Sequence, residues 1–184
     1  MMPGIDEPSD ESLIALVATG DREAFSCLMD RHKDKIYRLA YKMMGNAEEA
    51  EDVTQEVFLR VWSHAGTFTP SAKFSTWIFA ISANLCRSRL RSIWRRFKSL
   101  KEDYTVHLNN DTASPDKQLI RREQQARIDT AIQALPPNQR TALALWRYEN
   151  LSYLEIAEVM RCSAASVESL LFRAKTTLRQ KLIE

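Results

Sequence analysis

The sequence predicts an all-α fold, with two small helical domains joined by a flexible linker and a helix-turn-helix in the C-terminal domain. Glycine occupies only four of the 184 positions, and few segments alternate polar and apolar residues as strands do. Apolar residues instead recur at intervals of three and four, the spacing that places them on one face of a helix. Helix start and stop signals then divide the chain.

The first predicted helix follows Asp21 and ends at Gly45, a residue type that is common just beyond a helix C-terminus. Its apolar face consists of Phe25, Leu28, Met29, Ile36, Leu39, Ala40 and Met43. Asn46 and Glu49 have the spacing of a capping box, so a second helix should begin there and run to about His64.

A third helix should begin near Phe74, after a turn-rich loop over residues 66–71, and continue into a basic segment. Residues 87–101 carry seven basic groups and no acid: Arg87, Arg89, Arg91, Arg95, Arg96, Lys98 and Lys101. Residues 1–86 carry 13 acidic and 8 basic side chains, a net charge of −5. A basic run beside an acidic body favours contact with a polyanion, although a solvated basic helix end has the same composition.

Residues 101–114 are polar and lack periodicity, which predicts a linker between an N-terminal domain (1–100) and a C-terminal domain (115–184). Ser114-Pro115 has the order of an N-cap and a first helical residue. The helix that follows carries Leu119, Ile128, Ile132 and Leu135. Pro136-Pro137 should end that helix and begin the next one.

Composition excludes several classes of protein. No stretch approaches the roughly 18 uninterrupted apolar residues of a membrane span, and the acidic N-terminus lacks the apolar core of a signal peptide. The three cysteines are far apart in sequence: Cys27, Cys86 and Cys162. They predict neither a disulfide framework nor a zinc site, and a reduced, cytoplasmic compartment fits best. The histidines are scattered and there is no Gly-rich phosphate loop, so we expect no enzyme activity, metal or cofactor.

The second predicted helix has an outward half that is mostly acidic and polar, with one leucine in its middle. On a helical wheel this half holds Asp52, Gln55, Glu56, Leu59 and Arg60. Two interpretations stay open. The face could be solvated and carry a Glu56–Arg60 pair worth roughly 0.3–0.5 kcal/mol, or it could dock a protein with Leu59 as its apolar anchor.

The third predicted helix combines aromatic side chains with the basic ones. The aromatic residues are Phe74, Trp77, Phe79, Trp94 and Phe97. Arginines bind phosphates and aromatic faces accept unstacked bases, and Asn84 could hydrogen-bond a base edge. Phe74 and Trp77 could equally be core residues. The arginines have no such alternative, because burial of so many unpaired charges costs too much.

The C-terminal segment has the pattern of a helix-turn-helix. Ser152 and Glu155 have the spacing of a capping box, and only Arg161-Cys162 separates that helix from the next, which Ser163 should cap. In the last helix one apolar arc holds Val167, Leu170, Leu171, Ala174 and Leu178. The opposite side carries Ala165, Ser169, Phe172 and Thr176, with Ser166, Glu168, Arg173 and Lys175 on its edges. This side suits contacts with base edges in a major groove, although helical hairpins without DNA partners have the same pattern.

Five short motifs occur in order over nearly the whole chain, within residues 20–182. They are DVTQEVFLRVW at 52–62, FSTWI at 74–78, NL at 84–85, LPP at 135–137 and LSYLEIA at 151–157. Together they resemble the extracytoplasmic-function (ECF) group of bacterial sigma-70-type sigma factors. That resemblance implies an alternative sigma factor that gives core RNA polymerase promoter specificity and is controlled by an anti-sigma factor.

The resemblance also implies which residues bind which partner. Core polymerase, at the coiled coil of its β′ subunit, would contact Asp52, Gln55, Glu56, Leu59 and Arg60. The promoter −10 element would contact Phe68, Lys73, Trp77, Asn84, Arg87, Arg89 and Arg91, with a base of the opened strand held by the loop matching 64–73. The −35 element would contact Ala165, Ser166, Glu168, Ser169, Phe172, Arg173 and Lys175. The C-terminal domain would also touch the polymerase β flap.

Glu168 departs from the family pattern, because members often carry arginines in this helix. Its carboxylate could accept a hydrogen bond from cytosine N4, or it could lie at the edge and weaken phosphate contact. A competing hypothesis for the whole chain is a stand-alone helix-turn-helix regulator whose N-terminal half senses or dimerises. Such a regulator would bind duplex DNA without core polymerase.

Overall fold

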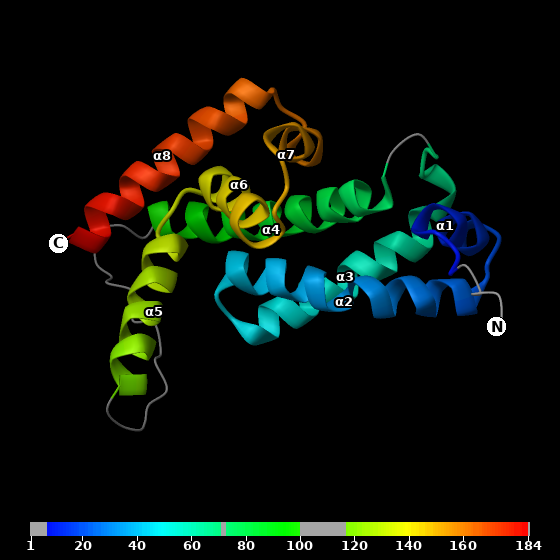
Figure 1. The fold of residues 1–184 in the computed structure, drawn as a ribbon, viewed down its shortest axis with the longest axis horizontal. Coiled ribbons are helices and arrows are strands. Elements are labelled where there is room, and N and C mark those ends of the chain that lie inside the picture. Colours follow the sequence, from blue (N-terminus) through cyan, green and yellow to red (C-terminus); the bar gives the residue numbers. More distant parts are fainter. Residues whose placement is uncertain (1–6, 71–72, 100–116, 184) are drawn as a thin grey trace, which may run out of the picture.

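The computed structural model describes residues 7–70, 73–99 and 117–183 (Figure 1). In chain order the elements are α1 (Asp10–Ala18), α2 (Arg22–Met44), α3 (Ala47–His64), the short 3₁₀ helix η1 (Ala65–Thr67), α4 (Phe74–Ser99), α5 (Lys117–Gln133), α6 (Pro137–Tyr148), α7 (Tyr153–Met160) and α8 (Ala164–Ile183). These three segments contain no strand, which confirms the all-α prediction. The predicted linker 101–114 and the Ser114-Pro115 cap lie outside the described residues.

The predicted ends of α2 and α3 are confirmed. The Asp21 carboxylate accepts hydrogen bonds from two backbone N–H groups in the first turn of α2, at 2.9 and 3.0 Å. Gly45 ends that helix with a left-handed φ of 75°, a conformation that glycine adopts without strain. Asn46 caps α3 by accepting from the Glu49 N–H at 3.1 Å. The Glu49 carboxylate, expected to complete a capping box, pairs instead with Arg89 of α4 at 2.9 Å.

The sequence patterns did not predict α1. Its start is capped by Ser9, whose hydroxyl accepts from the Ser12 N–H at 3.1 Å. Leu13, Ile14 and Val17 are buried against neighbouring helices. A helix of nine residues spans too few turns for hydrophobic periodicity to be distinctive. Packing against α2, η1, α3 and α4 is what defines it.

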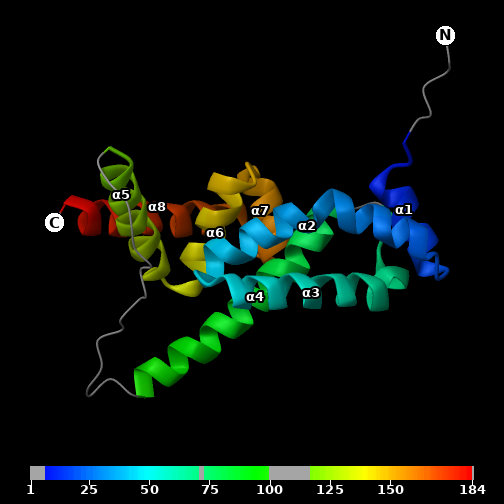
Figure 2. The same cartoon turned by 90° about the horizontal axis from the view of Figure 1, so that it is seen from below.

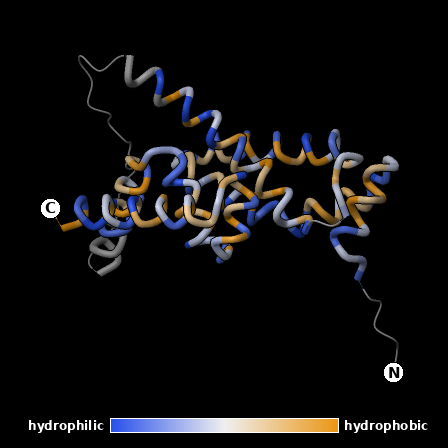
Figure 3. Tube along the Cα trace, turned by 90° about the horizontal axis from the view of Figure 1, so that it is seen from above, coloured by the Kyte–Doolittle hydropathy of each residue, from blue (hydrophilic) through white to orange (hydrophobic). Residues whose placement is uncertain are grey.

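The long helix α4 contacts helices from both halves of the chain. It packs against α2 and α3, and also against α6 and α7. Its C-terminal end projects away from the rest of the molecule (Figure 2). Along that end hydrophilic residues alternate with apolar ones (Figure 3). The described part of the basic run lies along the C-terminal half of α4, up to Ser99.

The helix-turn-helix prediction is confirmed in α7 and α8, which pack on each other and on α6. Pro137 is the first residue of α6, as the double proline predicts. The apolar arc of α8 faces inward: Val167, Leu171 and Ala174 are buried, and Leu170 and Leu178 are partly buried.

The guanidinium of Arg140 joins the two groups of helices, α1–α4 and α5–α8. Arg140 is only 3% exposed. It donates to the Met43 carbonyl at the end of α2 (2.7 Å), and to the Gln133 and Leu135 carbonyls at the end of α5. Carbonyls at a helix C-terminus lack intrahelical partners and lie at the negative end of the helix dipole, so they favour a cation. Burial lowers the pKa of Arg140 to about 10, which still leaves it protonated at neutral pH.

Two ion pairs made by residues of α2 cross the same boundary. Arg38 of α2 lies 3.4 Å from Glu149, and Lys42 lies 3.2 Å from Asp129 of α5. The Lys42 ammonium is also 5.2 Å from the ring centre of Tyr148. The Lys42–Asp129 pair is partly exposed, and such pairs contribute at most about 1 kcal/mol. The Glu149 side chain is only 3% exposed and burial raises its pKa, so its pairing with Arg38 offsets the cost of burying the carboxylate. We expect Arg140, which donates to three carbonyls, to contribute most of the polar stabilisation here.

We predict that Arg140→Ala destabilises the chain, because three buried carbonyls lose a charged donor. Hydrogen bonds to a charged group contribute roughly 1.5–3 kcal/mol, so the free energy of unfolding should fall by about 2–4 kcal/mol. Urea denaturation measures this change. Arg147→Ala on the exposed side of the same helix is the matched control, and an unaltered midpoint for Arg140→Ala would contradict the prediction.

Candidate functional site

The outward face of α8 carries the predicted −35 residues. All seven are exposed: Ala165, Ser166, Glu168, Ser169, Phe172, Arg173 and Lys175. The Phe172 side chain is 71% exposed, so it points away from the core as the helical wheel predicts. Ser163 caps this helix by accepting from the Ser166 N–H at 3.2 Å. The role of these residues in DNA binding stays a prediction.

The connection between α7 and α8 is fixed at both ends of α7. The Ser152–Glu155 capping box is complete, with the Ser152 N–H donating to the Glu155 carboxylate at 3.0 Å and the Glu155 N–H donating to the Ser152 hydroxyl at 3.3 Å. These bonds and nearby Lys73 lower the pKa of Glu155. At the other end Arg161 adopts a left-handed φ of 54°. The chain then turns so that the Cys162 N–H reaches the Ala157 carbonyl at 3.0 Å.

Lys175 differs from the other residues on the α8 face. Its ammonium lies 3.9 Å from the ring centre of Trp146 on α6. A cation over an aromatic ring contributes about 0.5–1 kcal/mol when the cation is exposed, so the lysine is held against its own domain. The sequence did not predict this contact, because the two residues lie on different helices.

The outward face of α3 has the features of both interpretations that the sequence left open, a surface ion pair and an exposed apolar side chain. Arg60 and Glu56 form the predicted ion pair at 2.8 Å. Leu59, in the middle of the same face, is 64% exposed, and the side chain of Asp52 is also largely exposed. A lone apolar side chain among polar groups has the character of an interface anchor.

The aromatic residues of α4 divide between core and surface. Phe74 and Phe79 are buried in the core, so they cannot offer their faces to bases. Trp77 is partly buried and lies 5.6 Å from Phe68, measured between ring centres. The side chains of Trp94 and Phe97 lie outside the described residues. Among the described side chains, Trp77 of the predicted aromatic platform and Phe68 of the preceding loop remain candidates for base contact.

Arg87 corrects the expectation that the α4 arginines must face solvent. It is only 8% exposed, and it donates to the Asn84 side chain. Its Nε has no hydrogen-bond partner among the described residues. Burial lowers the pKa of Arg87, and the neighbouring Arg91 and Arg161 add to the effect. Proximity to Arg161 shows that the end of α7 covers this part of α4.

The other predicted −10 residues lie in different surroundings. Lys73, an exposed side chain, forms an ion pair with Glu155 of α7 at 3.2 Å. Arg89 is half-buried against Glu49 and lies 3.9 Å from Asp52 of the α3 face. Arg91 is exposed. The structure therefore gathers these residues along α4, but it covers several of them with α7 or pairs them with acidic groups.

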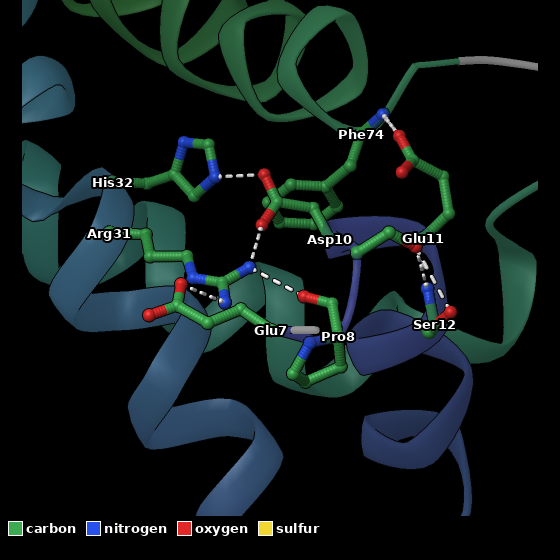
Figure 4. Close-up of polar contacts among 9 residues, drawn as sticks. Glu7, Pro8, Asp10, Glu11, Ser12, Arg31, His32 and Phe74 are labelled. Carbon is green, nitrogen blue, oxygen red and sulfur yellow. Dashed lines mark hydrogen bonds and ion pairs between the residues drawn. The ribbon is translucent and has the colours of Figure 1, made fainter. Parts of the chain in front are cut away.

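A network of polar contacts joins α1 to α2 and to the start of α4 (Figure 4). The Asp10 carboxylate accepts from Arg31 at 2.9 Å and lies 2.6 Å from Nε2 of the buried His32. The neighbouring Glu11 carboxylate accepts from the Phe74 N–H at 2.9 Å. Burial would raise the pKa of Asp10, but the hydrogen bonds from Arg31 and His32 outweigh it and lower the pKa below its ordinary value.

Two other kinds of site are absent from the residues that the structure describes. None of the helices in the described part of the chain is both long and apolar enough to cross a membrane. Among residues 7–70, 73–99 and 117–183, no three His, Cys, Asp or Glu side chains are gathered as metal ligands.

Comparison with protein families and curated proteins gives consistent matches. The family described as "Sigma-70 region 2" matches residues 28–96, and "Sigma-70, region 4" matches residues 125–178. The RNA polymerase sigma-H factor of Pseudomonas aeruginosa is 33% identical, over 97% of this chain and 96% of that protein. The ECF RNA polymerase sigma factor SigW of Bacillus subtilis is 32% identical, over 92% of this chain and 94% of that protein.

Two solved structures share the fold. CnrH, in complex with the cytosolic domain of CnrY, aligns with a TM-score of 0.70 and 24% identity, over 95% of this chain and 97% of that one. The sigma factor RpoE of Bartonella quintana, in complex with the anti-sigma factor NepR, aligns with a TM-score of 0.66 and 21% identity, over 87% and 97%.

We predict that Asp10 stabilises the chain in a pH-dependent way. Its folded pKa lies below the unfolded value of about 3.9, so the unfolded state binds more protons between these values and stability rises with pH there. The contribution is complete above about pH 4 and is lost as pH falls through the folded pKa. The loss of unfolding free energy in Asp10→Asn should therefore be largest at neutral pH and shrink in acid. Urea denaturation across pH measures it, with exposed Asp30→Asn as control, and a pH-independent difference would refute the prediction.

Proposed function

The chain belongs to the extracytoplasmic-function (ECF) sigma factors, and we propose that it directs core RNA polymerase to a particular class of promoters and helps to open them. It acts as a transcription initiation factor, not as an enzyme, in the bacterial cytoplasm where the polymerase works. The observation that carries this proposal is the similarity to sigma factors over nearly the full chain. Two exposed faces, on α3 and α8, supply the surfaces that such a factor needs.

The outward face of α3 is the proposed contact with core polymerase. Leu59 offers an apolar anchor, and the surrounding Asp52, Gln55, Glu56 and Arg60 form a polar rim. The resemblance to the family assigns this face to the coiled coil of the β′ subunit. The net negative charge of residues 1–86 would also favour a basic partner surface.

The outward face of α8 is the proposed contact with the −35 element. Ser169 and Arg173 can hydrogen-bond base edges or phosphates, and the exposed Phe172 ring can contact a thymine methyl group. Glu168 is exposed on the same helix and could accept a hydrogen bond from cytosine N4. The domain that carries α8 would also touch the β flap, as the resemblance implies.

The −10 element is proposed to contact Phe68, Lys73, Trp77, Asn84, Arg87, Arg89 and Arg91. Arg87 lies under the end of α7, and Lys73 is paired with Glu155 of that helix. A DNA strand can therefore reach this surface only after α7 moves away from α4. We propose that binding to the polymerase separates the two groups of helices. A phosphate would then take the place of Glu155 beside Lys73 and would also pair with Arg87, whose Nε has no hydrogen-bond partner among the described residues.

An anti-sigma factor is the proposed regulator. The solved relative RpoE is bound to the anti-sigma factor NepR. An anti-sigma factor would act here by covering the α3 face or by holding α7 against α4. Either contact would keep the polymerase-binding or the −10 surface from its partner.

The first test is reconstituted transcription. The purified chain and core polymerase together should initiate from specific sites in a pool of genomic promoters, whereas either component alone should not. Sequencing the transcript start sites measures this outcome and gives the promoter consensus. Absence of promoter-specific initiation would overturn the proposal, and tight duplex binding without core enzyme would favour a stand-alone regulator.

Arg173→Ala tests the α8 face. Loss of one base or phosphate contact should weaken −35-dependent initiation by roughly 1–3 kcal/mol in promoter binding. Affinity for core polymerase should be unchanged, because Arg173 is exposed on α8 and lies far from α3 in the fold (Figure 1). Promoter titration and polymerase binding assays separate the two effects, and loss of polymerase binding would mean that the face is wrongly assigned.

The double substitution Asp52→Ala and Glu56→Ala tests the α3 face. It should lower affinity for core polymerase, because it removes two acidic rim groups and the pairing partner of Arg60. DNA contact by the C-terminal domain should stay as in the wild type. Glu51→Ala, an exposed acid on the same helix, is the matched control. Equal polymerase affinity of the double variant and wild type would count against this docking face.

A further inference from the structure

The start of α4 is held by a carboxylate from a distant part of the chain. Glu11 of α1 accepts from the Phe74 N–H at 2.9 Å, although the two residues are 63 positions apart. The first N–H groups of a helix lack intrahelical acceptors and lie at the positive end of its dipole. A carboxylate there fixes the position of the first turn of α4. Figure 4 shows Glu11 directed at this N–H from the side of α1.

The ring of Phe74 is fixed from the same side. Phe74 is fully buried, and its ring lies edge-on to His32, with ring centres 5.1 Å apart. Asp10, next to Glu11 in α1, holds that imidazole at 2.6 Å. Two adjacent acidic residues of α1 thus constrain Phe74 of α4. Glu11 holds its backbone N–H, and Asp10 holds His32, which packs against the Phe74 ring.

Phe74 is in turn the centre of an aromatic junction, formed by Phe68, Phe74 and Trp77. Phe68 lies 6.2 Å and Trp77 lies 6.0 Å from the Phe74 ring centre. Phe68 and Trp77 contact each other edge-on at 5.6 Å. They are the two aromatic residues of this region that are partly open to solvent and are proposed to meet unpaired bases. Movement of Phe74 would therefore change the orientation of both.

We infer that Glu11 is a positioning residue for capture of the opened −10 strand, an inference that rests on the proposed function. Glu11 touches no DNA in this arrangement. It fixes Phe74, and through Phe74 it holds Phe68 and Trp77 ready for a base. Capture of an unstacked base requires a preformed surface, because each group that must be ordered on binding reduces affinity. Asp10 supports the same junction through His32.

Binding of forked promoter DNA by the full chain with core polymerase tests the inference. The probe has an unpaired non-template −10 strand, with its sequence taken from the mapped start sites. Glu11→Ala should weaken binding about tenfold, as loss of one hydrogen bond to a charged group does. Glu11→Gln should restore most of the affinity, because its side-chain oxygen can still accept the Phe74 N–H. Glu23→Ala removes an exposed acid from the first turn of α2, the helix that follows α1 in the chain, and should have no effect.

An abasic probe distinguishes positioning from a general structural role. We would scan an abasic site along the −10 strand and select the position that weakens wild-type binding most. On that probe the Glu11→Ala loss should largely disappear, because the two changes remove the same contact. An unchanged tenfold loss would overturn the inference. Tighter binding by Glu11→Ala would do so too, because it would mean that Glu11 occupies a phosphate site at the helix N-terminus.

Two further measurements cover the cases in which Glu11→Ala does not fold or the proposed function itself fails. Glu11→Asp keeps the charge but is one methylene too short to reach the Phe74 N–H, so it repeats the test if Glu11→Ala does not fold. It should weaken binding to intact forked DNA, and affinity equal to wild type would overturn the inference. Wild-type holoenzyme that fails to bind any forked promoter DNA would overturn the proposed function itself, whereas a failure confined to the Glu11 variants concerns only the positioning role.

Discussion

The buried guanidinium of Arg140 determines how the two groups of helices lie against each other. A desolvated cation must find several acceptors, and here they are carbonyls at the ends of α2 and α5, which have few other partners. Both helix ends must therefore meet at one point. Gly45 lies at the same point, and a side chain there would overlap the side chain of Gln133. Once α5 and α6 are fixed at the end of α2, α6 and α7 come to lie along α4.

This arrangement gives the three proposed binding surfaces different accessibility. Leu59 on α3 and Phe172 on α8 are exposed while the helix groups are together. Arg87 on α4 is covered, and Lys73 is occupied by Glu155. If the proposed assignments hold, polymerase engages the α3 face without any rearrangement, whereas contact with the −10 strand requires the helix groups to part. The order of binding events proposed for the chain follows from this difference in burial.

The boundary between the helix groups is suited to separation. Apart from Arg140, its described polar contacts include the partly exposed pairs Lys42–Asp129 and Lys73–Glu155, which contribute little individually and can be replaced by water. The Nε of the buried Arg87 has no hydrogen-bond partner among the described residues, and this opposes closure because a desolvated guanidinium gains from any anion that reaches it.

The sequence by itself determined the helices and their ends, because caps and hydrophobic periodicity act within a few residues. Asp21, Gly45 and Ser152 mark helix boundaries that the structure confirms. The helical wheel drawn from the sequence of α8 also predicts correctly that Phe172 points outward. Motif order also identified the family. The local sequence signals were too weak to predict α1, a helix of nine residues that is stabilised by packing against neighbouring helices.

Only the tertiary structure decided which charged groups are covered and which residues from distant helices meet. A helical wheel describes a single helix, so it cannot show contacts between helices. The burial of Arg87 under α7, the position of Lys175 over Trp146 and the hydrogen bond from the Phe74 N–H to Glu11 are contacts of that kind. The same limit explains why Phe79 was grouped with a base-binding platform and is in fact core. Burial and long-range hydrogen bonds depend on how helices assemble, and assembly is set by contacts between residues that are far apart in sequence.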